Sequence, residues 1–159
     1  MNKPTFLKAT VSAVALALLV SCGGGSEEKP AAAAKSANPG GLTDWQMTNG
    51  VGPMTSDVQV GPGVDEELAA TGGELFETKC SACHKLDERY VGPPLRMVTE
   101  KRTPTYIMNM VLDPEGMVKK HPEARKMLAQ YMTPMTNQNV SEEQARALLE
   151  YLRQADAEK

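Results

Sequence analysis

From residue 72 onward, the spacing of apolar residues in this 159-residue chain predicts helices, and no convincing strand pattern competes with them. The pattern becomes helical at Gly72, after which Phe76 and Cys80 lie four positions apart on one helix face. The last helix has the clearest apolar stripe, formed by Ala145, Leu148, Leu149 and Leu152. Ser141 and Gln144 have the spacing of a capping box, which predicts that this helix begins at Ser141.

Two more helices are predicted between these, and a proline opens each of them. Thr103 is the expected N-cap of the first, with Pro104 at the first helical position. That helix is predicted to stop at Asp113-Pro114. A shorter helix opens at His121-Pro122 and ends before Pro134, because proline cannot continue a helix interior. The pattern therefore predicts an all-α domain.

The first 21 residues predict an export signal. Lys3 and Lys8 form a basic region ahead of an apolar run from Ala9 to Val20, which is shorter than the roughly 20 residues needed to span a bilayer. The run ends in Leu19-Val20-Ser21-Cys22, which resembles a bacterial lipobox. We therefore expect residues 1–21 to be a lipoprotein signal peptide and Cys22 to carry lipid. The alternative is an ordinary signal peptide with a cysteine near its cleavage site.

Composition divides the rest of the chain into three parts. Residues 22–41 are rich in Gly, Ser, Pro and Ala and predict a flexible, lipid-anchored linker. Residues 42–66 contain the only tryptophan, Trp45, and the alternating Val58-Gln59-Val60. They form either more linker or an extended arm that packs on the domain with Trp45 as its anchor. Residues 67–159 form the domain itself.

Charge is distributed unevenly along the exported part of the chain. Residues 22–71 carry seven acidic and two basic side chains, whereas residues 72–159 carry 13 of each. The domain is thus formally neutral. It has no basic stripe of the kind that binds nucleic acid, so no nucleic-acid partner is expected.

The sequence CSACH at residues 80–84 carries the candidate chemistry, because C-x-x-C-H is the spacing of a covalent haem c attachment site. The thiols of Cys80 and Cys83 can each add to a vinyl group on one haem edge. His84 then lies where it can bind the iron. A thioredoxin-like redox pair and half of a zinc site are alternatives. Zinc would need further ligands, for which the chain offers only His121 and Cys22, and the redox pair expects a βαβ context that is not predicted.

The cysteine count agrees with haem attachment. The chain has three cysteines, an odd number that suits no disulfide scaffold. If Cys80 and Cys83 hold haem and Cys22 holds lipid, no thiol is left over.

Four stretches occur in an order and spacing that a known family shares. They are Gly73-Glu74-Leu75-Phe76, the motif at 80–84, Val91-Gly92-Pro93-Pro94-Leu95, and Pro134-Met135 ahead of Val140-Ser141-Glu142-Glu143. Together they resemble the class I bacterial cytochromes c, and most closely the small cytochrome c551/c552 electron carriers. The resemblance covers about residues 70–154. It implies a small all-α fold wrapped around one covalently bound haem c.

The resemblance also implies a role for each residue of the site. Cys80 and Cys83 form the thioethers, and His84 is the proximal iron ligand. The Pro93 carbonyl accepts the free imidazole N–H of His84, which orients the ring. Met135 is the distal iron ligand. Phe76 and Tyr151 are expected to meet where the first and last helices cross.

Met132 is the alternative to Met135 as distal ligand. The family usually has proline directly after the axial methionine, whereas here Thr136 follows Met135 and Pro134 precedes it. Met132 lies three positions earlier. Met135 is preferred because its distance from Val140, at the start of the last helix, matches the short pattern of the family.

Three further expectations concern the region around the haem. Arg96 is a candidate partner for a haem propionate in a loop face that is otherwise solvated. His121 lies in a lysine-rich turn and is expected at the surface. The segment 100–131 is longer than in the smallest family members and is a candidate for an added helix over the haem edge.

The function that follows is a membrane-tethered mono-haem electron carrier, which passes single electrons between respiratory redox partners by outer-sphere transfer. No paired carboxylates or spare histidine are arranged for acid–base catalysis, so no enzyme activity and no small-molecule substrate are expected. A peroxidase-like haem catalyst, which needs an open sixth position, and a sensing or structural subunit of a larger complex are alternatives. We expect a monomer with transient partners, anchored through Cys22 on the periplasmic side of the envelope, with the outer membrane favoured.

Overall fold

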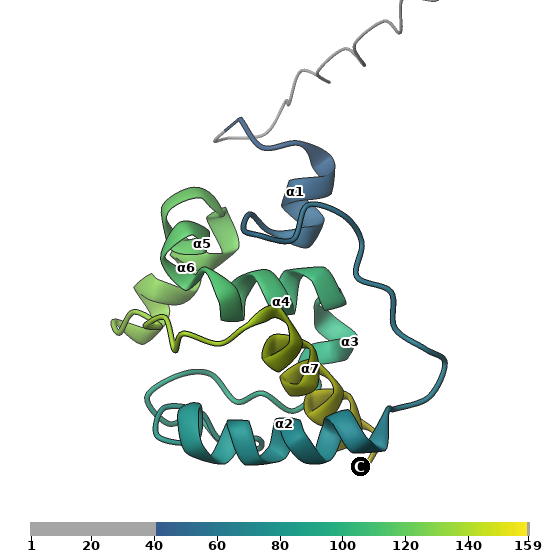
Figure 1. Cartoon of the computed structure of the whole chain (residues 1–159). Coiled ribbons are helices and arrows are strands. Elements are labelled where there is room, and N and C mark those ends of the chain that lie inside the picture. The colour runs from purple at the N-terminus through teal and green to yellow at the C-terminus, as the bar shows by residue number, and fades with distance from the viewer. Residues whose placement is uncertain (1–40, 159) are drawn as a thin grey trace, which may run out of the picture. The chain divides into compact units, whose positions relative to one another are not determined.

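The computed structural model describes residues 41–158, so the predicted signal peptide, Cys22 and the linker up to residue 40 lie outside the described residues. Residues 41–158 contain seven helices and no strand: α1 (Asp44–Asn49), α2 (Glu66–Lys79), α3 (Val98–Lys101), α4 (Pro104–Leu112), α5 (Pro114–Lys120), α6 (Pro122–Tyr131) and α7 (Glu142–Ala157) (Figure 1). The all-α prediction is confirmed. None of these helices is long and apolar enough to cross a bilayer.

The crossing of α2 and α7 organises the domain (Figure 1). The two helices meet at Gly72, where an added Cβ would lie 2.0 Å from the carbonyl oxygen of Ala147. One turn further on, the rings of Phe76 and Tyr151 pack with their centroids 5.1 Å apart. The predicted contact between these two rings is therefore confirmed. Only glycine permits the backbones to approach so closely.

Most helix ends follow the predicted caps. The Ser141 side chain accepts from the Gln144 N–H while the Gln144 side chain accepts from the Ser141 N–H, so the capping box of α7 is complete. Thr103 caps α4, with Pro104 at its first position. The start of α2 was predicted too late. This helix begins at Glu66, because the Asp65 side chain caps it by accepting from the Leu68 N–H.

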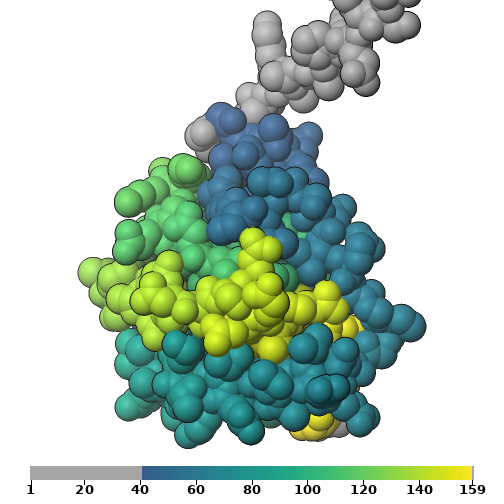
Figure 2. Space-filling view, in the orientation of Figure 1, coloured from purple at the N-terminus to yellow at the C-terminus, as the bar shows by residue number. Residues whose placement is uncertain are grey.

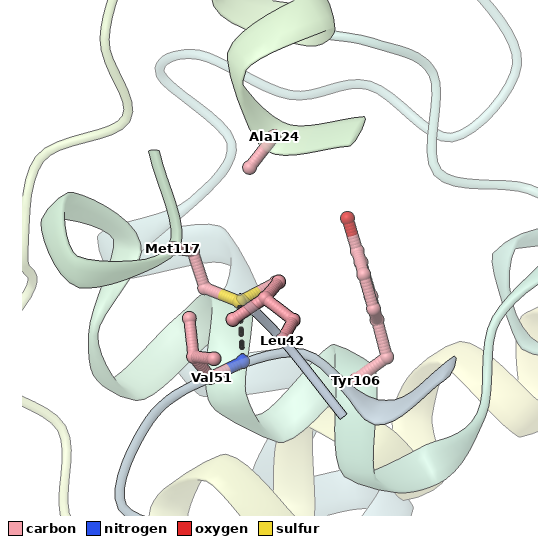
Figure 3. Close-up of a cluster of buried hydrophobic side chains, with 5 residues drawn as sticks. All are labelled: Leu42, Val51, Tyr106, Met117 and Ala124. Atoms are coloured by element: carbon pink, nitrogen blue, oxygen red, sulfur yellow. Dashed lines mark hydrogen bonds between the residues drawn. The ribbon is translucent and has the colours of Figure 1, made fainter. Parts of the chain in front are cut away.

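The segment before α2 is packed on the helices and is no free linker. We call residues 42–64 the arm; it includes α1. Leu42 and Val51 of the arm are buried in a cluster with Tyr106 of α4, Met117 of α5 and Ala124 of α6 (Figure 3). In the space-filling view, the blue arm lies directly beside the green surface of α5 and α6 (Figure 2).

Trp45 is not the main anchor of the arm. Its side chain is only partly buried, and its indole N–H donates to Asp57 within the arm at 2.8 Å. The buried anchors are Leu42 and Val51, and the backbone N–H of Val51 lies 3.2 Å from the sulfur of Met117. The arm is thus held by aliphatic burial rather than by its one tryptophan.

The predicted surface position of His121 is wrong. His121 ends the turn between α5 and α6 and is completely buried. Its Nε2 lies 3.1 Å from the carbonyl oxygen of Met47 in the arm, and its ring meets the ring of Tyr106 edge-on. The lysine-rich neighbourhood suggested exposure, but the arm covers this turn.

Candidate haem site

The CSACH motif forms a tight turn at the end of α2. The N–H groups of Cys83 and His84 both donate to the carbonyl oxygen of Cys80, at 3.0 and 2.9 Å. Cys80 is half-buried and Cys83 is exposed, and neither is in a disulfide. Burial raises the pKa of the Cys80 thiol, against an opposing effect of Lys79. The turn therefore places two free thiols and an imidazole in one short stretch of backbone.

The loop at residues 91–94 holds the His84 ring in place. Nδ1 of His84 lies 2.9 Å from the carbonyl oxygen of Pro93. A Cβ added at Gly92 would lie 2.5 Å from the ring, so the backbone must pass close beside it. The Gly92 N–H also donates to the carbonyl of Cys83 at 2.8 Å. With Nδ1 committed to Pro93, Nε2 is the nitrogen left for a metal, which is the arrangement expected of a ligating histidine.

The motif opens into two adjoining pockets with largely apolar walls. The residues that line both pockets are Cys80, His84, Pro93, Met110, Met127, Tyr131 and Met135. Beyond these, Val91, Val118, Ala124 and Leu128 line one pocket, and Phe76, Leu95, Ile107, Leu148 and Leu152 line the other. The cavity thus draws on α2, α4, α5, α6 and α7, although the sequence places these elements far apart.

The two candidate methionines differ sharply in position. Met135 is partly buried and lines both pockets. Met132 lines neither of them and is 81% exposed. It caps the C-terminus of α6 in the left-handed conformation, with φ of 57°. That turn leaves Met132 in solvent and leads the chain back so that Met135 reaches the cavity.

One wall of the cavity is polar and basic. The hydroxyl of Tyr106 is buried with no hydrogen-bond partner. The Arg102 guanidinium lies 4.8 Å from the centroid of that ring, and Lys101, Arg102 and Tyr106 all line the same pocket. A buried hydroxyl without a partner is costly, so this wall suits an acidic group such as a porphyrin carboxylate. No sequence motif marks Arg102 or Tyr106 as part of this site.

Arg96 is already engaged with protein groups. It forms an ion pair with Asp87 and donates to the carbonyl oxygen of Ala155. The hydrogen bond from Arg96 lowers the pKa of the Asp87 carboxyl. Arg96 also borders the cavity, as does Arg102, which pairs with Glu123 at 3.3 Å and lies over the ring of Tyr106.

The donor set and the cavity fit a haem c. Two thiols and an imidazole come from the turn after α2, and one thioether comes from the loop after α6. The walls between them are apolar, as a porphyrin ring requires, and the unpaired Tyr106 hydroxyl can meet its carboxylates.

Comparisons with known proteins agree with this fit. The family model described as cytochrome c matches residues 69–156. Cytochrome c from Rhodothermus marinus is 47% identical, with a TM-score of 0.68, and the match covers 72% of this chain and 97% of that one. An engineered form of the Rhodothermus marinus protein bound to a carbene intermediate is 46% identical over 70% of this chain and 96% of that one, with a TM-score of 0.64. A comparison with curated proteins found no match. The chain therefore belongs to the cytochrome c family, and it is an electron carrier with one covalently bound haem c.

Proposed function

We propose that the protein is a membrane-tethered cytochrome that carries single electrons between respiratory redox partners, with Cys80 and Cys83 as the thioether residues and His84 and Met135 as the axial ligands. One observation carries the site assignment. A single cavity brings together both thiols, the imidazole and one of the two candidate thioethers, and leaves the other in solvent.

The residues around the cavity prepare it for outer-sphere transfer. When bound, haem c supplies an iron that gains and loses one electron. The Pro93 carbonyl orients the His84 ring and increases its donor strength through the Nδ1–H bond. A methionine on the other axial position raises the reduction potential by favouring the reduced state. The apolar walls exclude water, so few polar groups need to reorient when the charge changes.

The side of the motif turn is the proposed point of electron entry and exit. Cys83 is exposed, and Val91, which lines the cavity, is 37% exposed. A partner that covers these residues comes close to the haem edge without entering a substrate pocket. Such contacts are transient and small in area, which is compatible with the proposed monomer.

Matched methionine variants test the ligand assignment. We expect Met135→Ala to lose the sulfur-to-iron charge-transfer band of the ferric protein, lower the reduction potential and allow CO to bind the ferrous form. Met132→Ala is the control and should leave all three properties unchanged, because its side chain lies in solvent. The opposite pattern would show that Met132 is the ligand.

The membrane tether is supported by the sequence of residues 1–22. The apolar run and its lipobox-like end indicate that Cys22 is the lipidated residue. The absence of aspartate directly after Cys22 favours the outer membrane. Export places the domain on the periplasmic side. Cys22→Ser should release soluble holoprotein into the periplasmic fraction. Holoprotein that stays in the membrane fraction would contradict the lipid anchor.

A further inference from the structure

The arm lies directly behind one wall of the haem cavity. The cluster that buries Leu42 and Val51 contains Tyr106 and Ala124 (Figure 3). Met110 and Val118 pack against this cluster. Those last four residues, Tyr106, Ala124, Met110 and Val118, also line the cavity. A single layer of side chains therefore separates the arm from the space that haem fills.

The segment that carries Met135, formed by α6 and the loop after it, packs on few other helices. α6 supplies Met127, Leu128 and Tyr131 to the cavity, and the loop that carries Met135 follows it directly. Among the described helices, α6 packs mainly on α5, and α5 packs on α4. Outside the helix contacts, Arg89 donates to the carbonyl oxygen of Gln130 and lies over the Tyr131 ring at the end of α6, and Arg102 pairs with Glu123 near its start.

The arm supplies a further attachment at the start of α6 and on α5. The carbonyl oxygen of Met47 lies 3.1 Å from Nε2 of the buried His121, immediately before α6. The Val51 N–H lies 3.2 Å from the sulfur of Met117, which is completely buried on α5. Both contacts connect the arm to α5 and to the start of α6, on the side away from the Arg89 contacts at the end of α6.

A buried asparagine joins the same arm to α4. The Asn109 side chain donates to the carbonyl oxygens of Asn49 and Met54, each at 3.1 Å, and accepts from the Met54 N–H at 2.9 Å. Asn109 is completely buried and does not line the cavity. The arm therefore bridges α4, α5 and α6 across the back of the haem site.

Two glycines allow the arm to lie so close. A Cβ added at Gly50 would lie 2.7 Å from the sulfur of Met117, and Gly50 has a positive φ of 79°. A Cβ added at Gly52 would lie 2.5 Å from Oδ1 of Asn109. A side chain at either position collides with Met117 or Asn109, and because both are completely buried, relief of the collision displaces the arm or disrupts its contacts with α4 and α5.

We infer that the arm positions the distal ligand: it clamps α5 and α6 onto α4 and thereby keeps the Met135 loop closed over the haem. The inference rests on the proposed ligation by Met135. Local openings of α6 and the loop are the motions that release an axial thioether, and contacts that hold this segment make such openings rarer. The arm thus acts on the iron through Met135 and touches neither the ligand nor the attachment motif.

Glycine variants of the full-length holoprotein test this role. Gly50→Ala and Gly52→Ala place a methyl group against Met117 and Asn109, neither of which lines the haem cavity. Gly63→Ala is the matched control, because it lies in the same arm with open space around its Cβ position. We expect cyanide to displace the thioether of the ferric protein about tenfold faster or more in the two disturbed variants, since overpacking favours the open state. Their reduction potential should fall and their sulfur-to-iron band should weaken, whereas Gly63→Ala should match the wild type.

Trp45 provides an independent readout of the arm, because it is the only tryptophan in the chain and lies in α1. Haem quenches nearby tryptophan, so displacement of the arm should raise the Trp45 fluorescence. A raised fluorescence with unchanged cyanide kinetics and potential would overturn the inference. Gly52→Leu enlarges the collision with Asn109. The inference would also be overturned if the Trp45 fluorescence stayed at the wild-type level in Gly50→Ala, Gly52→Ala and Gly52→Leu.

The methionine variants separate this inference from the proposed ligation. If Met135→Ala keeps the sulfur-to-iron band, the ligand assignment fails. If Met135→Ala loses the band but the arm variants behave like the wild type, the ligand assignment stands and only the role of the arm is wrong.

Discussion

Two adjacent glycines at the crossing of α2 and α7 allow the energetic importance of the close helix contact to be measured. Gly72 is buried, and an added Cβ would meet the Ala147 carbonyl oxygen at 2.0 Å and its carbon at 2.5 Å. Gly73 is only partly buried, and its nearest new contact would be the Tyr151 ring at 3.3 Å. Gly72→Ala must therefore separate two helix backbones, whereas Gly73→Ala needs only a small shift of one ring.

The two substitutions share one contribution to the free energy of unfolding and differ in a second. Each raises the free energy of unfolding by about 0.8–1 kcal/mol, because alanine is favoured over glycine in a helix interior. Overpacking costs about 1–3 kcal/mol in general, and Gly72→Ala lies at the upper end because backbone atoms cannot rotate away. We expect Gly72→Ala to lose about 2 kcal/mol of unfolding free energy and Gly73→Ala to gain up to about 1 kcal/mol. The difference of about 3 kcal/mol measures the close approach of the helices.

Guanidinium unfolding of the two holoproteins, followed by helix circular dichroism, measures this difference. With the dependence of unfolding free energy on denaturant concentration that is usual for a small domain, this difference corresponds to a shift of about 1 M in the guanidinium midpoint. The slopes should stay equal, because neither change alters the surface exposed on unfolding. Equal midpoints for Gly72→Ala and Gly73→Ala would refute the argument that helix contact at Gly72 requires glycine.

Four other changes have expected outcomes in the same assays. Glu150→Gln should cost about 2 kcal/mol, because this completely buried carboxylate pairs with two arginines that would lose their counter-charge, and a loss that vanished in high salt would contradict burial. Asp156→Ala should cost about 2 kcal/mol by leaving two N–H groups at the start of α3 without an acceptor. Ser141→Ala should cost about 1 kcal/mol by removing the cap of α7, with Ser141→Asp close to the wild type. The double variant Cys80→Ala, Cys83→Ala should hold no haem and show much weaker helix circular dichroism, because the empty cavity removes a large part of the core; a fully helical product would contradict that dependence.

Helix ends were predictable wherever the signal is local. A capping box involves residues three positions apart, so Ser141 and Gln144 specify the start of α7 without help from the rest of the chain. The same logic was available for α1, whose capping box joins Thr43 and Gln46, but the surrounding composition suggested a linker. From sequence, Asp113-Pro114 predicts only the end of a helix. In the structure, Asp113 ends α4 and also caps α5, so one signal serves two helices.

The candidate site was predictable to the extent that its residues lie in short motifs. Cys80, Cys83 and His84 form one turn, and Pro93 reaches back to that turn from a nearby loop. Arg102 and Tyr106 were missed because their relevance arises from a buried hydroxyl without a partner, which only the packed structure reveals.

By itself, the sequence determined the attachment motif and the main helices, because each depends on residues within a few positions of one another. Tertiary structure decided that Met135 and not Met132 lines the cavity, that His121 is buried, and that the arm is packed. Burial of this kind depends on pairs such as Val51 and Met117, which are 66 positions apart. No local pattern can specify such a pair, because its energy exists only once both segments have found the same side of the domain.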